Sequence, residues 1–265
     1  MKTGLIGYNS STIHNEEERL IEAKNLKKLF KSRGKAVEAL KGISFTARDG
    51  EVFGLLGPNG AGKTTTLRIL STMLSPTGGT AIVEGHDILK EPAEIRRKIG
   101  FLSTETGLYD RLTPDDTLKF FGKLAGMEPS DIAKRADYLF DRLDLQKDRK
   151  RLVSGFSSGM KQKVSIARAL VHDPSVIVFD EPTNGLDVLT AKTVTDFLKE
   201  MRNEEKTVII STHILSVVEK ICDRFVIIDT GSIVAEGTLS ELLKKYDAAE
   251  LEDIFFKLVP ERSDA

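Results

Sequence analysis

Several features are scarce in this 265-residue sequence, and each scarcity excludes a class of protein. Cys222 is the single cysteine, so no disulfide can form within the chain, and we expect a reducing compartment such as the cytosol. No stretch approaches the roughly 18 uncharged apolar residues of a membrane-spanning helix. The longest apolar runs, such as residues 176–179 and 225–228, have the length of strands. The first 20 residues lack the long apolar segment of a signal peptide.

Net charge is also nearly absent, because 39 basic residues face 40 acidic ones, for a formal charge of -1. This balance gives no reason to expect a nucleic-acid partner, which would favour a strongly basic surface. The hydrophobic fraction of 40% and the charged fraction of 30% are those of an ordinary globular protein. Residues 1–18 are polar, and we expect a poorly ordered extension there.

From Ile21 onward, short apolar runs alternate with longer amphipathic stretches, which is typical of an α/β domain. Apolar runs of buried-strand length predict strands at residues 51–56, 81–83, 99–102, 176–180, 207–211 and 225–229. Helices are predicted at residues 63–74 and 190–202, the latter with Val194, Phe197, Leu198 and Met201 on one face.

The middle of the chain, residues 112–169, breaks this rhythm and is mainly helical in pattern. Thr113-Pro114-Asp115-Asp116 predicts a helix start, with a capping threonine, a proline at the first helical position and acids in the first turn. Two apolar stripes follow at helical spacing, and we expect both to pack in the core. They comprise Leu118, Phe121 and Leu124, then Ile132, Ala136, Leu139, Phe140 and Leu143.

The strongest chemical signal is a glycine-rich loop that follows the strand at residues 51–56 and precedes a helix. It consists of Gly57, Pro58, Asn59, Gly60, Ala61, Gly62, Lys63 and Thr64, a full match to the phosphate-binding loop pattern. Glycines let backbone N–H groups surround phosphate oxygens, and the helix directs its positive end to the same place. Lys63 can reach the terminal phosphates, and the Thr64 hydroxyl can ligate Mg²⁺. This loop predicts binding of a nucleoside triphosphate.

Two adjacent carboxylates, Asp180 and Glu181, end the apolar run at residues 176–179. The carboxyl end of a strand is where α/β sheets place their ligands. Asp180 is predicted to hold Mg²⁺ directly or through its water shell, and Glu181 to act as the general base toward the attacking water. Adjacent acids at a strand end are common, so the prediction depends on the phosphate loop that precedes them.

Four motifs in order carry a family resemblance. They are the loop from Gly57 to Thr65, then Phe156-Ser157-Ser158-Gly159-Met160, then Asp180 to Asp187, then Ser211-Thr212-His213. Together they resemble the nucleotide-binding domain of ABC transporters, over about residues 19–240, with 241–265 as a helical tail. The resemblance implies a P-loop NTPase (RecA-like) α/β core, an antiparallel β subdomain and an inserted helical subdomain at about residues 105–172.

The resemblance also assigns roles to particular positions. Phe30 corresponds to the aromatic residue that stacks on adenine, and His213 to the histidine that senses the γ-phosphate. Residues 156–160, here called the signature segment, contact the ATP of the other protomer in such domains. Asn184, Gly185, Leu186 and Asp187, here called the dimer loop, join the two sites. The resemblance thus implies ATP and Mg²⁺ as ligands, a second nucleotide-binding domain as a partner, and membrane-spanning permease subunits on other chains. The chain would then lie on the cytoplasmic face of the membrane.

Two positions depart from the family pattern. The usual signature is Leu-Ser-Gly-Gly-Gln, of which Ser157 and Gly159 are retained, while Ser158 adds a Cβ where glycine permits close approach. The family usually has a glutamine after residues 99–103 that contacts Mg²⁺ and water. Thr104 stands there, followed by Glu105, and either of them is a candidate for the metal-side contact.

Residues 107–114 and 251–258 resemble the sodium-export (NatA-like) and multidrug-export branch of the family. The alternative is a non-transport ABC ATPase of the translation or DNA-repair type. Translation members carry two motif sets on one chain, whereas this chain has one. Repair members insert a long coiled coil before the signature, and too few residues separate Lys63 from Phe156 for that. A generic P-loop kinase would need none of the later motifs.

Overall fold

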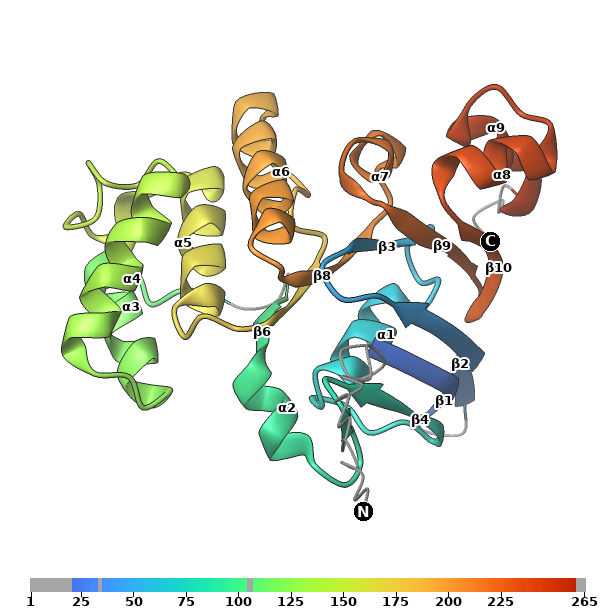
Figure 1. Ribbon diagram of the computed structural model, residues 1–265, viewed down its shortest axis with the longest axis horizontal. Helices are drawn as coiled ribbons and strands as arrows, with labels where there is room; N and C mark the ends of the chain where they lie inside the picture. Colours follow the sequence, from blue (N-terminus) through green and yellow to red (C-terminus); the bar gives the residue numbers. More distant parts are fainter. Residues whose placement is uncertain (1–20, 33–34, 104–106, 261–265) are drawn as a thin grey trace, which may run out of the picture.

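The computed structural model describes residues 21–32, 35–103 and 107–260, so the predicted extension at residues 1–18 lies outside the described residues. Two sheets form its frame (Figure 1). The larger has the order β10 (Ser232–Gly237), β9 (Arg224–Asp229), β3 (Val52–Leu56), β8 (Thr207–Thr212), β7 (Val176–Asp180) and β6 (Ile99–Leu102). Its strands pair in parallel from β9 to β6, and β10 is antiparallel to β9. The smaller sheet is antiparallel, with the order β2 (Lys35–Ala47), β1 (Ile21–Ser32), β4 (Gly78–Val83) and β5 (His86–Asp87).

The central strands are buried on both faces, which explains their nearly continuous apolar sequences. Every residue of β3, β7 and β8 is buried. Alternate residues of β3 enter different cores: Phe53 and Leu55 pack with the antiparallel sheet and helix α1 (Lys63–Leu70), and Val52 packs with the helices of the other face. Figure 1 shows α1 between the two sheets, with α6 (Val188–Asn203) and α7 (Leu215–Ile221) on the opposite side of the large sheet.

The predicted helical block is present as α3 (Pro114–Leu124), α4 (Pro129–Arg142) and α5 (Ser158–Leu170), with a 3-10 turn at Val153–Gly155. The predicted start of α3 is confirmed, because Thr113 and Asp116 cap it reciprocally. The second apolar stripe, from Ile132 to Leu143, is buried as predicted. The first stripe is wrong at Leu124, which is 75% exposed. Six residues at 3.6 per turn place Leu124 about 120° around the helix from buried Leu118.

Two further differences from the prediction have local causes. Helix α1 ends at Leu70 rather than Leu74, because Thr72 takes the left-handed conformation (φ 58°) and donates to the Ile69 carbonyl while Met73 donates to that of Arg68. This closing motif usually contains glycine, so its sequence signal is missing here. Strand β1 was not predicted as a strand, because a bulge after Ala23, with Asn25 at φ 50°, breaks its alternating pattern.

The remaining helices are α2 (Pro92–Lys98), α8 (Leu239–Tyr246) and α9 (Leu251–Leu258). Leu251 and Ile254 of α9 are buried in a third apolar cluster, together with Leu242 of α8 and Phe225 of β9. The C-terminal segment therefore packs on its own domain through one face of α9. Across the described part of the chain, no helix is long and apolar enough to cross a membrane.

Candidate active site

The glycine-rich loop joins β3 to α1, and its backbone geometry requires glycine. Gly60 and Gly62 have φ values of 77° and 111°, which glycine adopts without steric cost. A Cβ on Gly57 would lie 2.2 Å from the Ile228 carbonyl oxygen, and one on Gly62 would lie 2.8 Å from that of Ala39. The first-turn N–H groups of α1, which have no partner within the helix, face the same place. The loop and the helix start thus form a concave, electropositive seat suited to phosphate oxygens.

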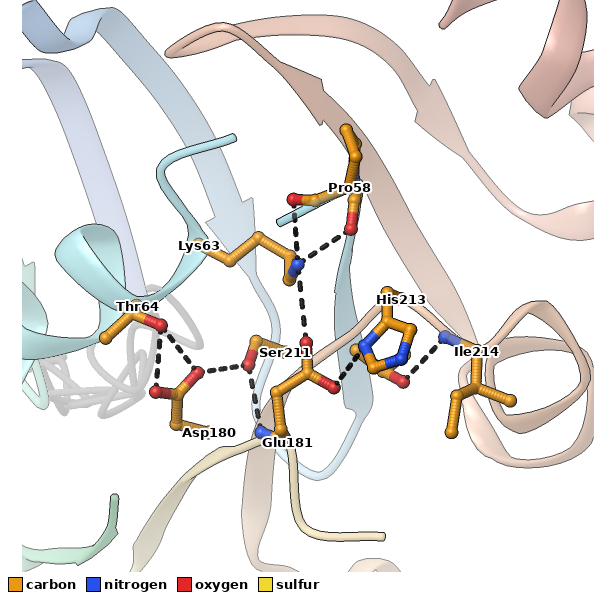
Figure 2. A network of polar contacts seen from close by, with 10 residues as sticks. Pro58, Lys63, Thr64, Asp180, Glu181, Ser211, His213 and Ile214 are labelled. Carbon is orange, nitrogen blue, oxygen red and sulfur yellow. Dashed lines mark hydrogen bonds and ion pairs between the residues drawn. The ribbon is translucent and has the colours of Figure 1, made fainter. Parts of the chain in front are cut away.

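Lys63 extends from the start of α1 back under this loop. Its side chain is only 5% exposed, and its Nζ donates to the carbonyl oxygens of Gly57 at 2.7 Å and Pro58 at 3.1 Å. The same nitrogen lies 3.3 Å from Glu181 Oε1 (Figure 2). These three oxygens compensate for the removal of the ammonium group from water. Lys63 also lines a cavity in front of the loop, so its ammonium group could interact with a phosphate bound in that cavity.

Asp180, the last residue of β7, is 1% exposed and brings two other elements together. Its carboxylate accepts hydrogen bonds from Thr64 Oγ1 at 2.9 and 3.0 Å, and from Ser211 Oγ at 2.5 Å (Figure 2). Hydroxyl and carboxylate oxygens are the donors that Mg²⁺ prefers, so this pair fits the ion. No group of three or more His, Cys, Asp or Glu that could hold a metal occurs in the described ranges. Mg²⁺ at this position would therefore need further oxygens from phosphate and water.

Glu181 turns sharply away from the end of β7. Its φ of 51° lies in the left-handed region, which costs a non-glycine residue roughly 1–2 kcal/mol. Its N–H donates to both the carbonyl and the Oγ of Ser211, each at 3.1 Å, which holds the turn. The carboxylate then lies between Lys63 and His213, whose Nδ1 is 2.9 Å from Oε2. Strained residues of this kind concentrate at functional sites.

A cavity of about 490 Å³ opens in front of the loop, which is within the usual size of small-ligand sites. One part of its wall is apolar and comes from the antiparallel sheet, including the ring of Phe30, which is 42% exposed. Another part is polar and comes from the phosphate loop and the end of β7. An exposed ring at one side and an anion seat at the other match a nucleotide's flat base and its phosphates. The lining residues are Phe30, Val37, Ala39, Asn59, Gly60, Ala61, Gly62, Lys63, Thr64, Thr65, Asp180, Glu181 and Asn184.

The signature segment does not line this cavity. Ser157 caps α5 by accepting a hydrogen bond from the Met160 N–H at 3.3 Å, and Ser157 and Ser158 are exposed. Phe156 is buried, with the Arg151 guanidinium 5.5 Å from its ring centroid. The structure therefore exposes Ser157 and Ser158 at the start of α5, and no residue of the segment lines the cavity of the same chain.

The two ends of the dimer loop make different contacts, one with the cavity and the other with helix α6. Asn184 reaches the cavity wall. Asp187 caps α6, accepting from the N–H groups of Leu189 and Thr190 at 3.0 Å and from the Thr190 hydroxyl at 2.7 Å. These hydrogen bonds, that of the Thr190 hydroxyl first, hold the pKa of Asp187 below its ordinary value. Gly185 and Leu186 lie between these two anchors and do not contact the cavity.

Ser211 was not predicted as a site residue, although its hydroxyl joins Asp180 to the Glu181 backbone. The sequence offered one signal: Ser211 ends the predicted strand at residues 207–211, which is the next predicted strand after the one that ends in Asp180. Val37 and Ala39, which line the cavity from β2, had no signal in the sequence. Thr104 and Glu105, the candidates for the metal-side contact, lie outside the described residues.

A phosphate loop before α1, a buried lysine, and an aspartate at the end of a parallel strand define a P-loop NTPase. Comparison with known proteins narrows this class. The family model described as ABC transporter matches residues 40–184, and the chain belongs to that family.

Several relatives align over most of the chain. NatA, an ABC transporter ATP-binding protein of Bacillus subtilis, is 43% identical over 87% of this chain and 94% of its own length. The doxorubicin resistance ATP-binding protein DrrA of Mycobacterium tuberculosis is 40% identical, over 86% of this chain and 67% of DrrA. The methionine import ATP-binding protein MetN 1 of Bacillus cereus is 36% identical, over 84% and 66% respectively.

A solved ATP-binding cassette, a dimer in a post-hydrolysis state with ADP and Pi bound, superposes with a TM-score of 0.76. It is 28% identical, over 83% of this chain and 98% of that one. The chain is thus an ATP-binding ATPase subunit of the ABC transporter type, in the branch of NatA and the drug-resistance proteins.

Proposed function

We propose that this chain hydrolyses ATP to drive export, of sodium or of a drug-like compound, through membrane-spanning subunits on other chains. One observation carries the proposal: Asp180 and Glu181, at the end of β7, face Thr64 and Lys63 of the phosphate loop. In this proposal Asp180 is the metal-side carboxylate and Glu181 is the base, and their contacts with the phosphate loop support these roles. The chain would work at the cytoplasmic face of the membrane, where its partners are embedded.

In the proposed binding mode, Phe30 stacks on the adenine ring and residues 57–65 surround the phosphates. Lys63 neutralises charge on the β- and γ-phosphates, as its buried ammonium group already faces the loop carbonyls. Thr64 and Asp180 would hold Mg²⁺, with Thr104 or Glu105 as a further candidate. When bound, Mg²⁺ would stabilise negative charge on the phosphate oxygens.

In the proposed reaction, water attacks the γ-phosphorus and its proton passes to the Glu181 carboxylate. The bond between the γ-phosphorus and the bridging oxygen breaks, and ADP and phosphate leave. An Nδ1–H of His213 can donate to Oε2 of the ionised Glu181 carboxylate, and this hydrogen bond would orient the carboxylate toward the water. The backbone turn at Glu181, fixed by Ser211, supplies the rest of the positioning.

A second copy or a related subunit would complete each site. The exposure of Ser157 supports this view, as does the fact that neither Ser157 nor Gly159 lines the cavity of its own chain. Two ATP molecules would then lie between two subunits, and binding would favour the closed pair over the open one. Hydrolysis would release the closed pair, and the membrane subunits would convert this cycle into alternating access.

Export rather than import is supported by the names of NatA-branch relatives such as DrrA, a resistance protein. MetN 1, an import protein, is also similar, so direction needs a direct test. The non-transport alternative receives no support from the helical block. Its helices α3 and α4 have 11 and 14 residues, whereas a DNA-repair ATPase would carry a long coiled coil there.

The substitution Glu181→Gln tests the reaction. It removes the base but keeps the size of the side chain, so we expect kcat to fall about 10²- to 10⁴-fold while ATP binding is retained. Size exclusion with MgATP should then show a stabilised dimer. Glu205→Gln is a matched control, since Glu205 also has a left-handed backbone (φ 60°) but lies in the exposed loop after α6. Turnover at the wild-type rate in Glu181→Gln would remove Glu181 from the role of base.

The membrane partner is tested by purifying the chain from membranes and identifying the polypeptides that accompany it. The chain and its membrane-spanning partner would then be produced together in cells. ATP-dependent efflux from those cells, and not uptake, would support export. Recovery of ribosomal or DNA-repair partners alone would favour the non-transport alternative.

A further inference from the structure

Helix α5, which begins within the signature segment, touches two neighbouring parts of its own chain. They are residues 181–187, here called the catalytic loop, and the first turn of α6. Gln162 Nε2 donates to the Pro182 carbonyl oxygen at 2.9 Å. Pro182 directly follows Glu181, so this hydrogen bond ends one residue from the proposed base. Figure 1 shows α5 between the pair α3–α4 and helix α6, which continues from the catalytic loop.

The second contact joins the signature glycine to the first turn of α6. Gly159 is buried, and a Cβ built on it would lie 3.0 Å from both Cγ2 and Oγ1 of Thr190. The Thr190 hydroxyl is fixed in turn by Asp187, the last residue of the dimer loop, at 2.7 Å. Gly159 has ordinary helical backbone angles, so close packing against Thr190 is a reason for glycine here besides any contact with phosphate.

Both contacts lie within one chain, whereas the nucleotide that the signature segment is proposed to touch belongs to the partner subunit. We propose that Gln162 and Thr190 are positioning residues that connect the signature segment to the catalytic loop of the same chain. When the partner's nucleotide binds the signature segment and shifts it, the two contacts would shift Pro182 and the dimer loop, and with them Glu181. Each site would thereby reach full activity only when the opposite site is filled. This inference depends on the proposed function, because it assumes hydrolysis at Glu181 and a paired subunit.

Gln162→Leu tests the first contact, since leucine is similar in size and lacks the amide donor. We expect kcat to fall about five- to tenfold, the effect of one lost hydrogen bond, with the Kd for ATP unchanged and any fall in Tm no larger than that of the Gln146→Leu control. The Hill coefficient for ATP should move toward 1. Gln146→Leu is the matched control, because Gln146 Nε2 makes a similar bond to the Asp137 carbonyl oxygen at 2.8 Å, inside the helical block. A wild-type kcat in Gln162→Leu would overturn the role of Gln162.

A double-mutant cycle tests the second contact. Thr190→Ala should lower kcat by loosening the contact, and Gly159→Ala should lower it by crowding Thr190. The double variant should recover, because the nearest atom left at position 190 is Cβ, at an ordinary 3.4 Å from the new methyl group. If Gly159 matters only for phosphate contact, the double variant will be no more active than Gly159→Ala, and the role of Thr190 is overturned.

Wild type and Glu181→Gln in the same assays separate this inference from the proposed function. Absence of ATP hydrolysis by the wild type, or full activity of Glu181→Gln, would contradict the proposed function itself. If the wild type hydrolyses ATP and Glu181→Gln does not, while the Gln162 and Thr190 variants keep the wild-type kcat, the inference alone is contradicted.

Discussion

Removal of one hydroxyl, by Ser211→Ala, should weaken both the fold and the metal side of the active site. Ser211 is fully buried, and its Oγ donates to Asp180 Oδ1 at 2.5 Å while accepting from the Glu181 N–H at 3.1 Å. The N–H keeps its second bond, to the Ser211 carbonyl oxygen, so the main loss falls on the buried carboxylate. A hydrogen bond to a charged group contributes about 1.5–3 kcal/mol. We therefore expect the free energy of unfolding to fall by about that amount.

The functional effect should appear mainly in the dependence on Mg²⁺. Asp180 keeps its bonds to Thr64 but loses a donor that fixes its orientation, so a higher Mg²⁺ concentration should be needed for half-maximal ATPase activity. Urea denaturation and ATPase rates across a Mg²⁺ titration measure the two effects. Ser216→Ala, at an exposed position of α7, serves as the control. Unchanged stability and an unchanged Mg²⁺ titration in Ser211→Ala would refute the assignment of Ser211 as the support of Asp180.

Three further outcomes follow from other parts of the molecule. Lys63→Ala should lose most affinity for ATP in a fluorescent-nucleotide titration, since it deletes the charge under the phosphate loop; near wild-type affinity would contradict the proposed binding mode. Burial lowers the pKa of His172 below its ordinary 6.5, so below about pH 6.5 the unfolded chain takes up a proton that the folded chain does not, and stability falls. The side chain of His172→Gln can still donate to the Ile99 carbonyl oxygen, and the variant should reduce the fall in the free energy of unfolding between pH 7.5 and 5.5, measured with urea, relative to His86→Gln. An equal fall in the two variants would argue against this role of His172. Thr113→Ala should cost about 1 kcal/mol of unfolding free energy by removing the cap of α3, and no loss would show that the cap contributes little.

Features that depend on a short continuous stretch were predictable from the sequence. The phosphate loop is one, because Gly60 and Gly62 meet a local need for positive φ values, and the strand before it is apolar throughout. The cap of α3 by Thr113 is another, since both partners lie within one turn. The burial of β7 and the carboxylates at its end also followed from a single run of residues.

Long-range partners were decided only by the tertiary structure. Ser211 meets Asp180 because β8 and β7 are neighbours in register, and nothing in either strand alone specifies that pairing. The bulge at Asn25 hides β1 from a search for alternation, yet that strand carries Phe30 to the cavity. Gly159 and Thr190 come into contact only when α5 packs beside the start of α6. A sequence fixes local conformation through each residue's own sterics and hydrogen bonds, whereas contacts between distant segments depend on how whole faces of strands and helices pack together.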